Sequence, residues 1–243
     1  MKIVGVIPAR LASSRFPRKA LALIVGRPMI LHVWERVRAF SRFERLIVAT
    51  DDESISQLII QNGGEVVLSN EPFKNGSERC ASAVSDIACD ICIDIQGDEI
   101  SIRPEQLERT VQVLENNPDL QVATAAFPVL QSEDLSDPNL VKVAVDASGH
   151  AIEFSRKPIT VAGQKITNYG HAGIYVYRKD FLIEYARLPQ TSREIAESLE
   201  QLRILEHGHK IGVAIINKPL LSVNTPEDLA LANRLFSQEG GVI

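Results

Sequence analysis

The sequence is poor in cysteine, with only Cys80, Cys89 and Cys92 among its 243 residues. An odd, small number of cysteines excludes a complete disulfide framework and fits reduced thiols. Cys89 and Cys92 lie in the tetrapeptide CDIC, but no second cysteine pair or histidine cluster is near them in the sequence. We therefore expect buried structural cysteines rather than a metal or redox site.

The chain also lacks a long hydrophobic run. No stretch approaches the roughly 18 apolar residues needed to span a bilayer. Met1 and Lys2 lead directly into a short apolar run, without the pattern of a signal peptide. We expect a cytoplasmic protein with no membrane partner.

Aromatic residues are scarce at 5%, and the net charge is −5. A nucleic-acid-binding chain is more often basic throughout and carries aromatic stacking platforms. The composition is otherwise that of a folded protein, with 45% hydrophobic and 23% charged residues. We therefore expect no nucleic-acid partner and a single compact unit.

Positive charge is concentrated at the N-terminal end. The first 45 residues hold ten Lys or Arg against two Glu, a net of +8, which leaves −13 for the rest. The sequence IPARLASSRFPRK places Arg10, Arg15, Arg18 and Lys19 within ten residues, directly after an apolar run. Small residues there would let the backbone approach a phosphate, although a solvated basic loop is the simpler alternative. The loop is neither a Walker loop nor a dinucleotide fingerprint.

The first 120 residues alternate strand and helix patterns with short connections. Such alternation is typical of right-handed βαβ units and a parallel sheet, which binds ligands at the carboxyl ends of its strands. Three polar loops leave those ends, at residues 8–19, 51–52 and 97–99. The expected strands are 2–7, 45–50, 65–69 and 91–96, and the expected helices are 28–40, 54–62, 78–87 and 104–115.

From Gln121 the pattern changes to alternating strands, which predicts an antiparallel insertion. Strands 141–145 and 151–155 bracket DASG, a hairpin turn. Residues 158–169 are polar and irregular and predict a flexible loop. We expect a strand at 173–177, one helix at 193–207, a strand at 212–216 and a last helix at 226–236. The helix at 193–207 would direct Ile195, Leu199 and Leu202 inward and its glutamates outward.

Two sequences predict local features at helix starts. NTPEDL has Thr225 as N-cap and Asp228 at the third helical position, which leaves only Asn224 without a structural reason. NGSER predicts a tight turn and cap, with Arg79 at a helix N-terminus where the macrodipole disfavours a cation. Arg79 is therefore a candidate for binding a ligand or an acidic partner.

The sequence IDIQGDEI predicts a magnesium site. It places Asp98 and Glu99 just past a buried strand, and Asp94 within that strand is either structural or directed at the site. Mg²⁺ prefers one or two carboxylates together with substrate phosphates. A carboxylate facing the cationic loop suits that role, whereas a simple turn is the alternative.

Seven motifs in order, spread over nearly the whole chain, resemble the 3-deoxy-manno-octulosonate (Kdo) cytidylyltransferases, also called CMP-Kdo synthetases. The motifs are IPARLASSRFPRKAL, VATDD, NGSER, IQGDE, HAGIYVYR, LEQLR and NTPEDL. The resemblance implies a Rossmann-like nucleotidyltransferase sheet of α/β class, mostly parallel, with an antiparallel insertion used for sugar binding and dimerisation. It also implies a homodimer that uses Mg²⁺ and CTP to activate a sugar acid for the lipopolysaccharide inner core.

The resemblance further implies one nucleotidyltransferase domain over residues 1–243. Its parts would be a nucleotide-binding core (1–120), an antiparallel sugar and dimer subregion (121–190) and a C-terminal completion of the core (191–243). Lys19, Arg10 and Asp98 would be catalytic, and Asp98 and Asn224 would hold the metal. The nucleotide would contact Ala9, Arg10, Arg15, Lys19, Thr50, Gly76, Arg79, Gln96 and Asp98, and the sugar acid would contact Arg156, His171, Tyr175 and Glu200.

The chain departs from the family pattern near the metal and the sugar. Asn224 stands where the family usually has an aspartate that binds the metal, and KPITVAGQKITN follows Arg156 in place of the usual sequence. These changes suggest Kdo or its 8-amino-3,8-dideoxy analogue as acceptor, and Glu194 or Glu197 could face an ammonium group on the latter. A sialic-acid relative or a non-catalytic CTP-binding protein are the alternatives.

Overall fold

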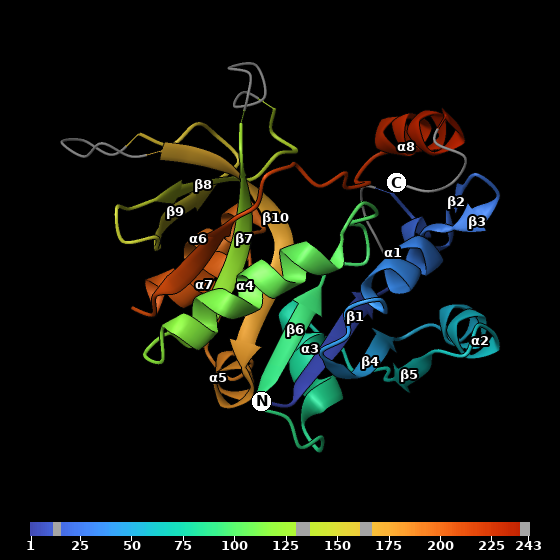
Figure 1. Ribbon diagram of the computed structural model, residues 1–243, viewed down its shortest axis with the longest axis horizontal. Coiled ribbons are helices and arrows are strands. Elements are labelled where there is room, and N and C mark those ends of the chain that lie inside the picture. Colours follow the sequence, from blue (N-terminus) through green and yellow to red (C-terminus); the bar gives the residue numbers. More distant parts are fainter. Residues whose placement is uncertain (12–15, 130–136, 161–166, 239–243) are drawn as a thin grey trace. The chain divides into compact units, whose positions relative to one another are not determined.

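The computed structural model describes residues 1–11, 16–129, 137–160 and 167–238. These residues form two compact units, one from Met1–Glu105 with Leu220–Ile243 and the other from Gln106–Pro219. Strands and helices alternate along most of the chain (Figure 1). The predicted α/β class, with mostly parallel strands and an antiparallel portion, is confirmed.

The first unit is built on four parallel strands in the order β6-β1-β4-β5. Every residue of β1 and β6 is buried, which explains why both strands are apolar in sequence apart from Asp94 in β6. The elements of this unit are β1 (Ile3–Ala9), η1 (Lys19–Leu21), β2 (Leu23–Ile24), β3 (Arg27–Pro28), α1 (Met29–Val37), β4 (Phe43–Thr50), α2 (Glu53–Gln61), β5 (Glu65–Leu68), α3 (Gly76–Val84), β6 (Ile91–Ile95) and α8 (Pro226–Gln238).

The second unit carries the antiparallel strands. β7 pairs parallel with β11 and antiparallel with β10, and β8 pairs antiparallel with both β10 and β9. The turn DASG joins β8 to β9, as predicted. Its strands are β7 (Val122–Pro128), β8 (Lys142–Val145), β9 (Ala151–Ser155), β10 (Thr167–Arg178) and β11 (Ile211–Ile215), and its helices are α5 (Lys179–Tyr185), α6 (Ser192–Glu197), α7 (Gln201–Glu206) and α4 (Pro104–Asn116), which begins at the boundary.

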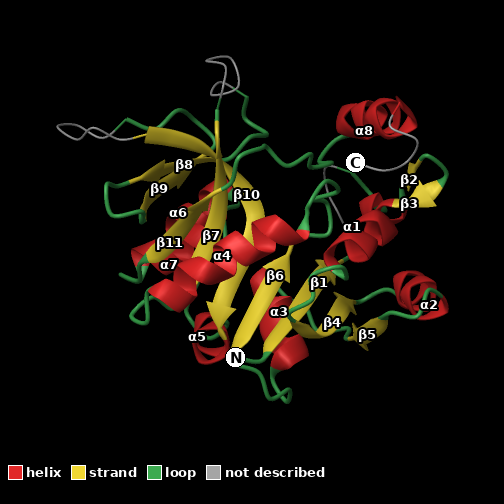
Figure 2. Cartoon of the chain, viewed as in Figure 1, coloured by secondary structure: helices red, strands yellow, loops and turns green. Residues whose placement is uncertain are grey.

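Three sequence predictions are wrong in detail. The helix expected at 193–207 is two helices, because Ser198 adopts a left-handed φ of 53° between α6 and α7. Helix α5 was not predicted, and residues 167–169, expected in an irregular loop, begin β10 (Figure 2). The rest of that expected loop, residues 161–166, lies outside the described residues.

The predicted caps are confirmed. Asn75 caps α3 by accepting a hydrogen bond from the Glu78 amide at 2.9 Å. At α8, Thr225 Oγ1 accepts from the Asp228 amide at 3.2 Å, and the Asp228 carboxylate accepts from the Thr225 amide at 2.9 Å. Each cap satisfies backbone N–H groups that have no partner within the helix.

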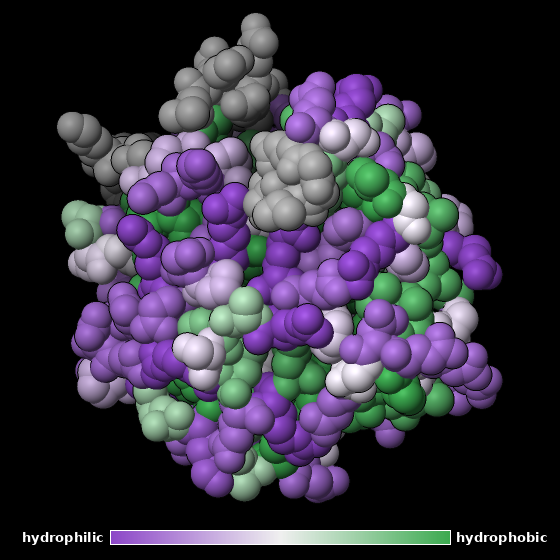
Figure 3. Space-filling view, turned by 45° about the vertical axis from the view of Figure 1, so that its right-hand side comes forward, coloured by the Kyte–Doolittle hydropathy of each residue, from purple (hydrophilic) through white to green (hydrophobic). Residues whose placement is uncertain are grey.

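Two of the three cysteines are buried, as the sequence predicts. Cys80 and Cys92 are buried and form no disulfide, but Cys89 is half-exposed because it precedes β6 rather than lying within it. The face shown in Figure 3 is mostly hydrophilic, with smaller hydrophobic areas among the polar side chains. In the described part of the chain, no helix is both long and apolar enough to cross a membrane.

Candidate active site

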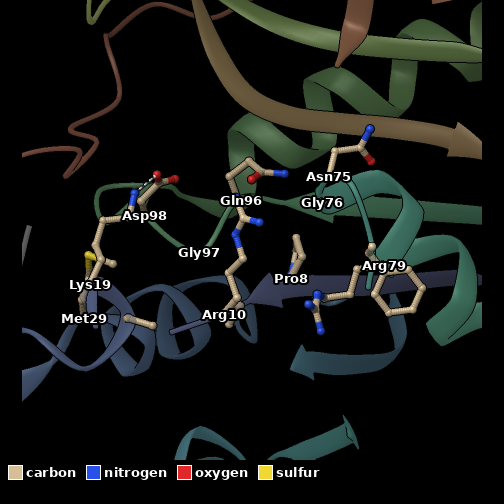
Figure 4. A pocket seen from close by; sticks show the side chains of 13 residues that line it. Pro8, Arg10, Lys19, Met29, Asn75, Gly76, Arg79, Gln96, Gly97 and Asp98 are labelled. Atoms are coloured by element: carbon tan, nitrogen blue, oxygen red, sulfur yellow. Dashed lines mark hydrogen bonds and ion pairs between the residues drawn. The ribbon is translucent and has the colours of Figure 1, made fainter. Parts of the chain in front are cut away.

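A cavity of about 210 Å³ opens in the first unit, at the carboxyl ends of β1 and β6 and the start of α3. The loops after β1, β4 and β6 leave the same edge of the parallel sheet, so residues distant in sequence meet there. Figure 4 shows Lys19 and Asp98 at one end of the cavity, Arg79 and Asn75 at the other, and Gln96 between them. The lining is Pro8, Ala9, Arg10, Lys19, Ala20, Met29, Phe73, Asn75, Gly76, Arg79, Gln96, Gly97 and Asp98.

The loop after β1 returns to the cavity. The Arg18 amide donates to the Leu11 carbonyl at 3.1 Å, and this bond closes the loop at its base. Arg18 has a left-handed φ of 59° and an exposed side chain outside the lining, whereas Lys19 begins η1 and lines the cavity with Arg10. Arg15 and the small residues 12–14 lie outside the described residues. Two of the four predicted cations therefore face one cavity.

Lys19 and Asp98 form the ion pair of the site. Lys19 Nζ donates to Asp98 Oδ2 at 2.5 Å, and both side chains are about one-fifth exposed. Among the described residues Asp98 makes no other side-chain hydrogen bond, so its Oδ1 is available to a ligand. The sequence predicts Asp98 opposite the cationic loop, whereas the direct contact between Asp98 and Lys19 is a finding of the structure.

Asn224 lies outside the cavity lining, but the residue before it is bonded to Asp98. The Val223 amide donates to the Asp98 carbonyl at 3.1 Å, and Ser222 Oγ donates to Glu99 Oε2 at 2.6 Å. The Asn224 amide is tied to Asp228 Oδ2 at 2.8 Å, while its half-buried side chain has no hydrogen bond to any described residue. Within the described residues, no three His, Cys, Asp or Glu side chains gather as a metal-binding group.

Arg79 lies at the end of the cavity away from Lys19. Its Nη2 donates to Asp51 Oδ2 at 2.8 Å, and its guanidinium lies over the Phe73 ring with the carbon 5.0 Å from the centroid. The Arg79 side chain is buried, and Nη1 has no hydrogen-bond partner among the described residues. An unpaired buried donor is costly, so a ligand oxygen or nitrogen at this end would satisfy it.

Two further residues assigned to the nucleotide occupy different places. Gly76 lines the cavity, where a Cβ would lie only 2.7 Å from Gln96 Nε2 and 3.2 Å from Pro8 Cγ, so any larger residue would displace them. Thr50 is fully buried at the end of β4 and outside the lining. Its Oγ1 accepts from the Asp52 amide at 3.2 Å, which shapes the loop that carries Asp51.

The residues assigned to the sugar acid all lie in the second unit. Arg156 Nε donates to the Glu197 carbonyl at 3.1 Å, and its Nη1 donates to the Pro138 carbonyl at 3.2 Å. The Glu200 carbonyl accepts from the Tyr185 hydroxyl at 3.2 Å, at the start of α7. Arg156 and Glu200 thus both lie at the turn between α6 and α7.

His171 and Tyr175 form a second group, with ring centroids 5.3 Å apart on β10. Thr124 Oγ1 donates its proton to the Ile174 carbonyl at 2.7 Å and lies 2.8 Å from His171 Nε2. Because the hydroxyl proton is already used, the His171 Nε2–H group is the donor to Thr124 Oγ1. Desolvation of the imidazole lowers the pKa of His171 to about 3, and the ring is therefore neutral at physiological pH.

One glutamate of α6 differs from its predicted outward orientation. Glu194 is buried and receives two bonds from the fully buried Arg203, at 2.8 Å from Nε and 2.6 Å from Nη2. Burial alone would raise the pKa of Glu194, but the bonds from Arg203 hold it below its usual value. Ile195, expected inside, is 62% exposed, whereas Leu199 and Leu202 are buried as predicted. Glu194 is therefore not available to an ammonium group on a substrate.

Sequence reasoning missed two residues of the cavity lining, the acidic partner of a third and one buried lysine of the second unit. Phe73 and Asn75 line it, and the signal was an aromatic residue two positions before the Asn-Gly turn. Asp51 was noted only as part of a polar loop, although it pairs with Arg79. Lys142 in the second unit carried no sequence signal; it is fully buried, and its Nζ donates to the Leu140 and Arg156 carbonyls at 2.9 and 2.8 Å.

Comparison with known proteins gives one consistent result. A family model described as cytidylyltransferase matches residues 4–211. The chain is 40% identical to a 3-deoxy-manno-octulosonate cytidylyltransferase of Pelobacter propionicus, over 97% of this chain and 98% of that protein. It is 39% identical to the protein of that name from Geobacter sulfurreducens, over 94% and 97% of the two chains.

A solved structure is similar over the same length. A CMP:2-keto-3-deoxy-manno-octonic acid synthetase complexed with CTP superposes with a TM-score of 0.89 at 37% identity. The match covers 98% of this chain and 100% of that one.

Proposed function

The chain belongs to the cytidylyltransferase family, and we propose that it transfers the cytidylyl group of CTP to 3-deoxy-manno-octulosonate, releasing pyrophosphate. In this reaction the anomeric hydroxyl oxygen of the sugar acid bonds to the α-phosphorus of CTP. The bond from that phosphorus to the bridging oxygen of the β-phosphate breaks, and the hydroxyl proton is lost. The observation that carries the proposal is the cavity in which Arg10 and Lys19 oppose Asp98.

The cations would act mainly by placing and neutralising the triphosphate. Nucleotidyl transfer depends on positioning and on stabilisation of charge in the transition state. Arg10 and Lys19 both line the cavity, and Lys19 is held in a defined position by Asp98. Arg15, on the same loop, is proposed as a third triphosphate ligand. Ala9, Gly76, Arg79, Gln96 and, behind them, Thr50 are proposed to surround the nucleoside.

The donor set beside the cations fits Mg²⁺. Asp98 offers a carboxylate oxygen that no described residue uses, and Asn224, which follows the Val223 amide bonded to the Asp98 carbonyl, offers an amide side chain. Mg²⁺ takes oxygen ligands and commonly keeps only one or two from the protein. Asp98 and Asn224 would hold the ion, which when bound neutralises charge on the phosphate oxygens.

The neutral side chain of Asn224 has a measurable consequence. A site with one carboxylate, itself paired with Lys19, should bind a divalent cation weakly in the absence of nucleotide. We expect Asn224→Asp to tighten Mn²⁺ binding by about tenfold, because ligand charge sets affinity at such sites. Electron paramagnetic resonance of free Mn²⁺ measures this without any turnover. Equal Mn²⁺ affinity in the two proteins would remove Asn224 from the metal site.

The sugar acid is proposed to contact Arg156, His171, Tyr175 and Glu200, with Arg156 pairing the carboxylate. Family membership further suggests a homodimer in the cytoplasm that supplies the lipopolysaccharide inner core. It also suggests that the two compact units work as one nucleotidyltransferase domain, with a core at 1–120, a sugar and dimer subregion at 121–190 and a completion at 191–243.

The test is release of pyrophosphate by the purified protein with Mg²⁺, each of CTP, UTP and ATP, and two acceptors. We expect turnover with CTP and Kdo. The 8-amino-3,8-dideoxy analogue should be used less well, because Glu194 is already bound by Arg203 and Glu197 Oε2 already accepts from the Arg156 amide at 3.5 Å. Faster turnover of the amino sugar would reverse the acceptor assignment. No turnover with CTP and either acceptor would reject the proposed activity.

A further inference from the structure

Asp94 is a buried carboxylate behind the cavity. It lies on β6, is 0% exposed and is outside the cavity lining. Ser77 Oγ donates to its Oδ2 at 2.9 Å, and Gln96 Nε2 donates to its Oδ1 at 2.9 Å. Burying a carboxylate is costly unless it is hydrogen-bonded, so this residue is held by specific partners from α3 and from the end of β6.

The bond to Asp94 fixes the side chain of Gln96. A carboxylate only accepts hydrogen bonds, so the amide nitrogen of Gln96 faces Asp94 and the amide cannot turn over. Close packing confines the same group, because a Cβ on Gly76 would lie 2.7 Å from Gln96 Nε2. The consequence is a defined orientation of Gln96 Oε1, an acceptor on a residue that lines the cavity.

The place of Gln96 indicates which ligand group it meets. In Figure 4 it lies between the Lys19 and Asp98 end and the Arg79 and Asn75 end of the cavity. We place the triphosphate at the Lys19 and Asp98 end of the cavity. The ribose joins the triphosphate to the base, so it is the part of the nucleotide that lies at Gln96. Ribose offers hydroxyl donors, which a fixed carbonyl oxygen accepts.

We propose that Asp94 is a positioning residue that orients Gln96 to accept a hydrogen bond from a ribose hydroxyl, and so makes the site selective for ribonucleotides. This inference rests on the proposed function, since it takes CTP as the ligand. Asp94 acts through Gln96 and Ser77 secures it from the other side, so none of its effect requires contact with the substrate.

The experiment is titration calorimetry with CTP, 2′-deoxy-CTP and 3′-deoxy-CTP. The unaltered protein should bind CTP about tenfold more tightly than at least one deoxy analogue, the range of one hydrogen bond. Asp94→Asn should reduce this preference to below about threefold, because an amide at position 94 can donate or accept and lets Gln96 turn over. In the Gln96→Ala background, Asp94→Asn should cause no further loss of preference.

Two more variants separate positioning from structural support. Ser77→Ala also removes a buried bond to Asp94 but leaves the bond to Gln96, and it should keep the preference. Gly76→Ala presses on Gln96 and Pro8 without altering Asp94 and should lose the preference, which tests the orientation of Gln96 separately from position 94.

The outcomes separate this inference from the proposed function. A less stable Asp94→Asn protein with the unaltered preference for ribonucleotides would overturn the positioning role. Absence of pyrophosphate release from CTP and Kdo by a protein that keeps the predicted preferences would overturn the proposed reaction alone.

Discussion

Lys19 and Asp98 satisfy each other's charge at the rim of the cavity, 2.5 Å apart. Removing either one takes away a preorganised charge partner of the reaction, and such losses typically cost on the order of 10² to 10³ in rate. We expect Lys19→Ala and Asp98→Asn each to lower kcat by this factor in the pyrophosphate-release assay.

The matched control for this loss of charge is Arg45→Ala. Arg45 is a cation of the same unit that pairs with Glu65 on the surface, outside the cavity lining. Its removal should change kcat by less than twofold, since surface ion pairs contribute little. Activity of Lys19→Ala or Asp98→Asn within threefold of the unaltered protein would contradict the assignment.

His171 gives a residue-level prediction for pH. Its pKa is about 3 in the folded protein, against an ordinary value near 6.5 in the unfolded chain. Between these values only the unfolded state binds the proton, so stability falls as pH falls from about 6.5 toward 3. His171→Gln should therefore reduce the pH dependence of the unfolding free energy by up to about 1.4 kcal/mol per pH unit in this range.

Urea denaturation at several pH values between 4.5 and 6.5 measures that slope. His150→Gln is the matched control, because it removes an imidazole from the turn between β8 and β9 instead. If His171→Gln and the unaltered protein lose stability equally on acidification, His171 does not take up a proton on unfolding.

At the scale of single elements, the turn between α6 and α7 differs most from its sequence pattern. Residues 193–207 have helical periodicity, but the left-handed φ of 53° at Ser198 ends α6 and lets Glu194 turn inward to Arg203. Glycine adopts such a φ without the cost that other residues have. Ser198→Gly should therefore keep or raise the stability, by up to about 1 kcal/mol.

Ser198→Ala is the control at the same position, and it should be no more stable than the serine protein. In a continuous helix the order would be opposite, since glycine costs about 1 kcal/mol relative to alanine in a helix interior. A glycine variant less stable than the alanine variant in guanidinium denaturation would show that the turn at Ser198 does not form.

At the scale of the whole molecule, ligand binding should be visible as thermal stability. A ligand that binds only the folded state at 100 times its Kd contributes about 2.7 kcal/mol. For a chain of this length that corresponds to a rise in Tm of about 5 to 10 °C. We expect this rise with CTP and Mg²⁺, measured by calorimetry, and a smaller one with ATP at the same concentration. Equal shifts with the two nucleotides would mean that the base is not recognised.

The sequence alone determined the class of fold and most of its elements. Ile3–Ala9 and Ile91–Ile95 are short and predominantly apolar, which favours buried strands, and their alternation with helices predicts a parallel sheet. The caps Asn75 and Thr225 depend on hydrogen bonds to residues three positions away, so the sequence predicts them as well. Cations cluster in the loop after the first strand, and Asp98 follows another strand of the same sheet. Because parallel strands end at the same edge of a sheet, the sequence predicts that these groups form a phosphate site there.

Only the tertiary structure decided which side chains meet. The pairing of Lys19 with Asp98, the bond from Ser77 to Asp94 and the burial of Glu194 by Arg203 each join residues of different elements, which periodicity places no nearer than any others. Periodicity reports which face of an element is apolar, whereas a buried polar contact depends on the distance between elements. A residue such as Asp94 gains its role from its hydrogen-bond partners, and those partners exist only once the sheet and α3 have packed.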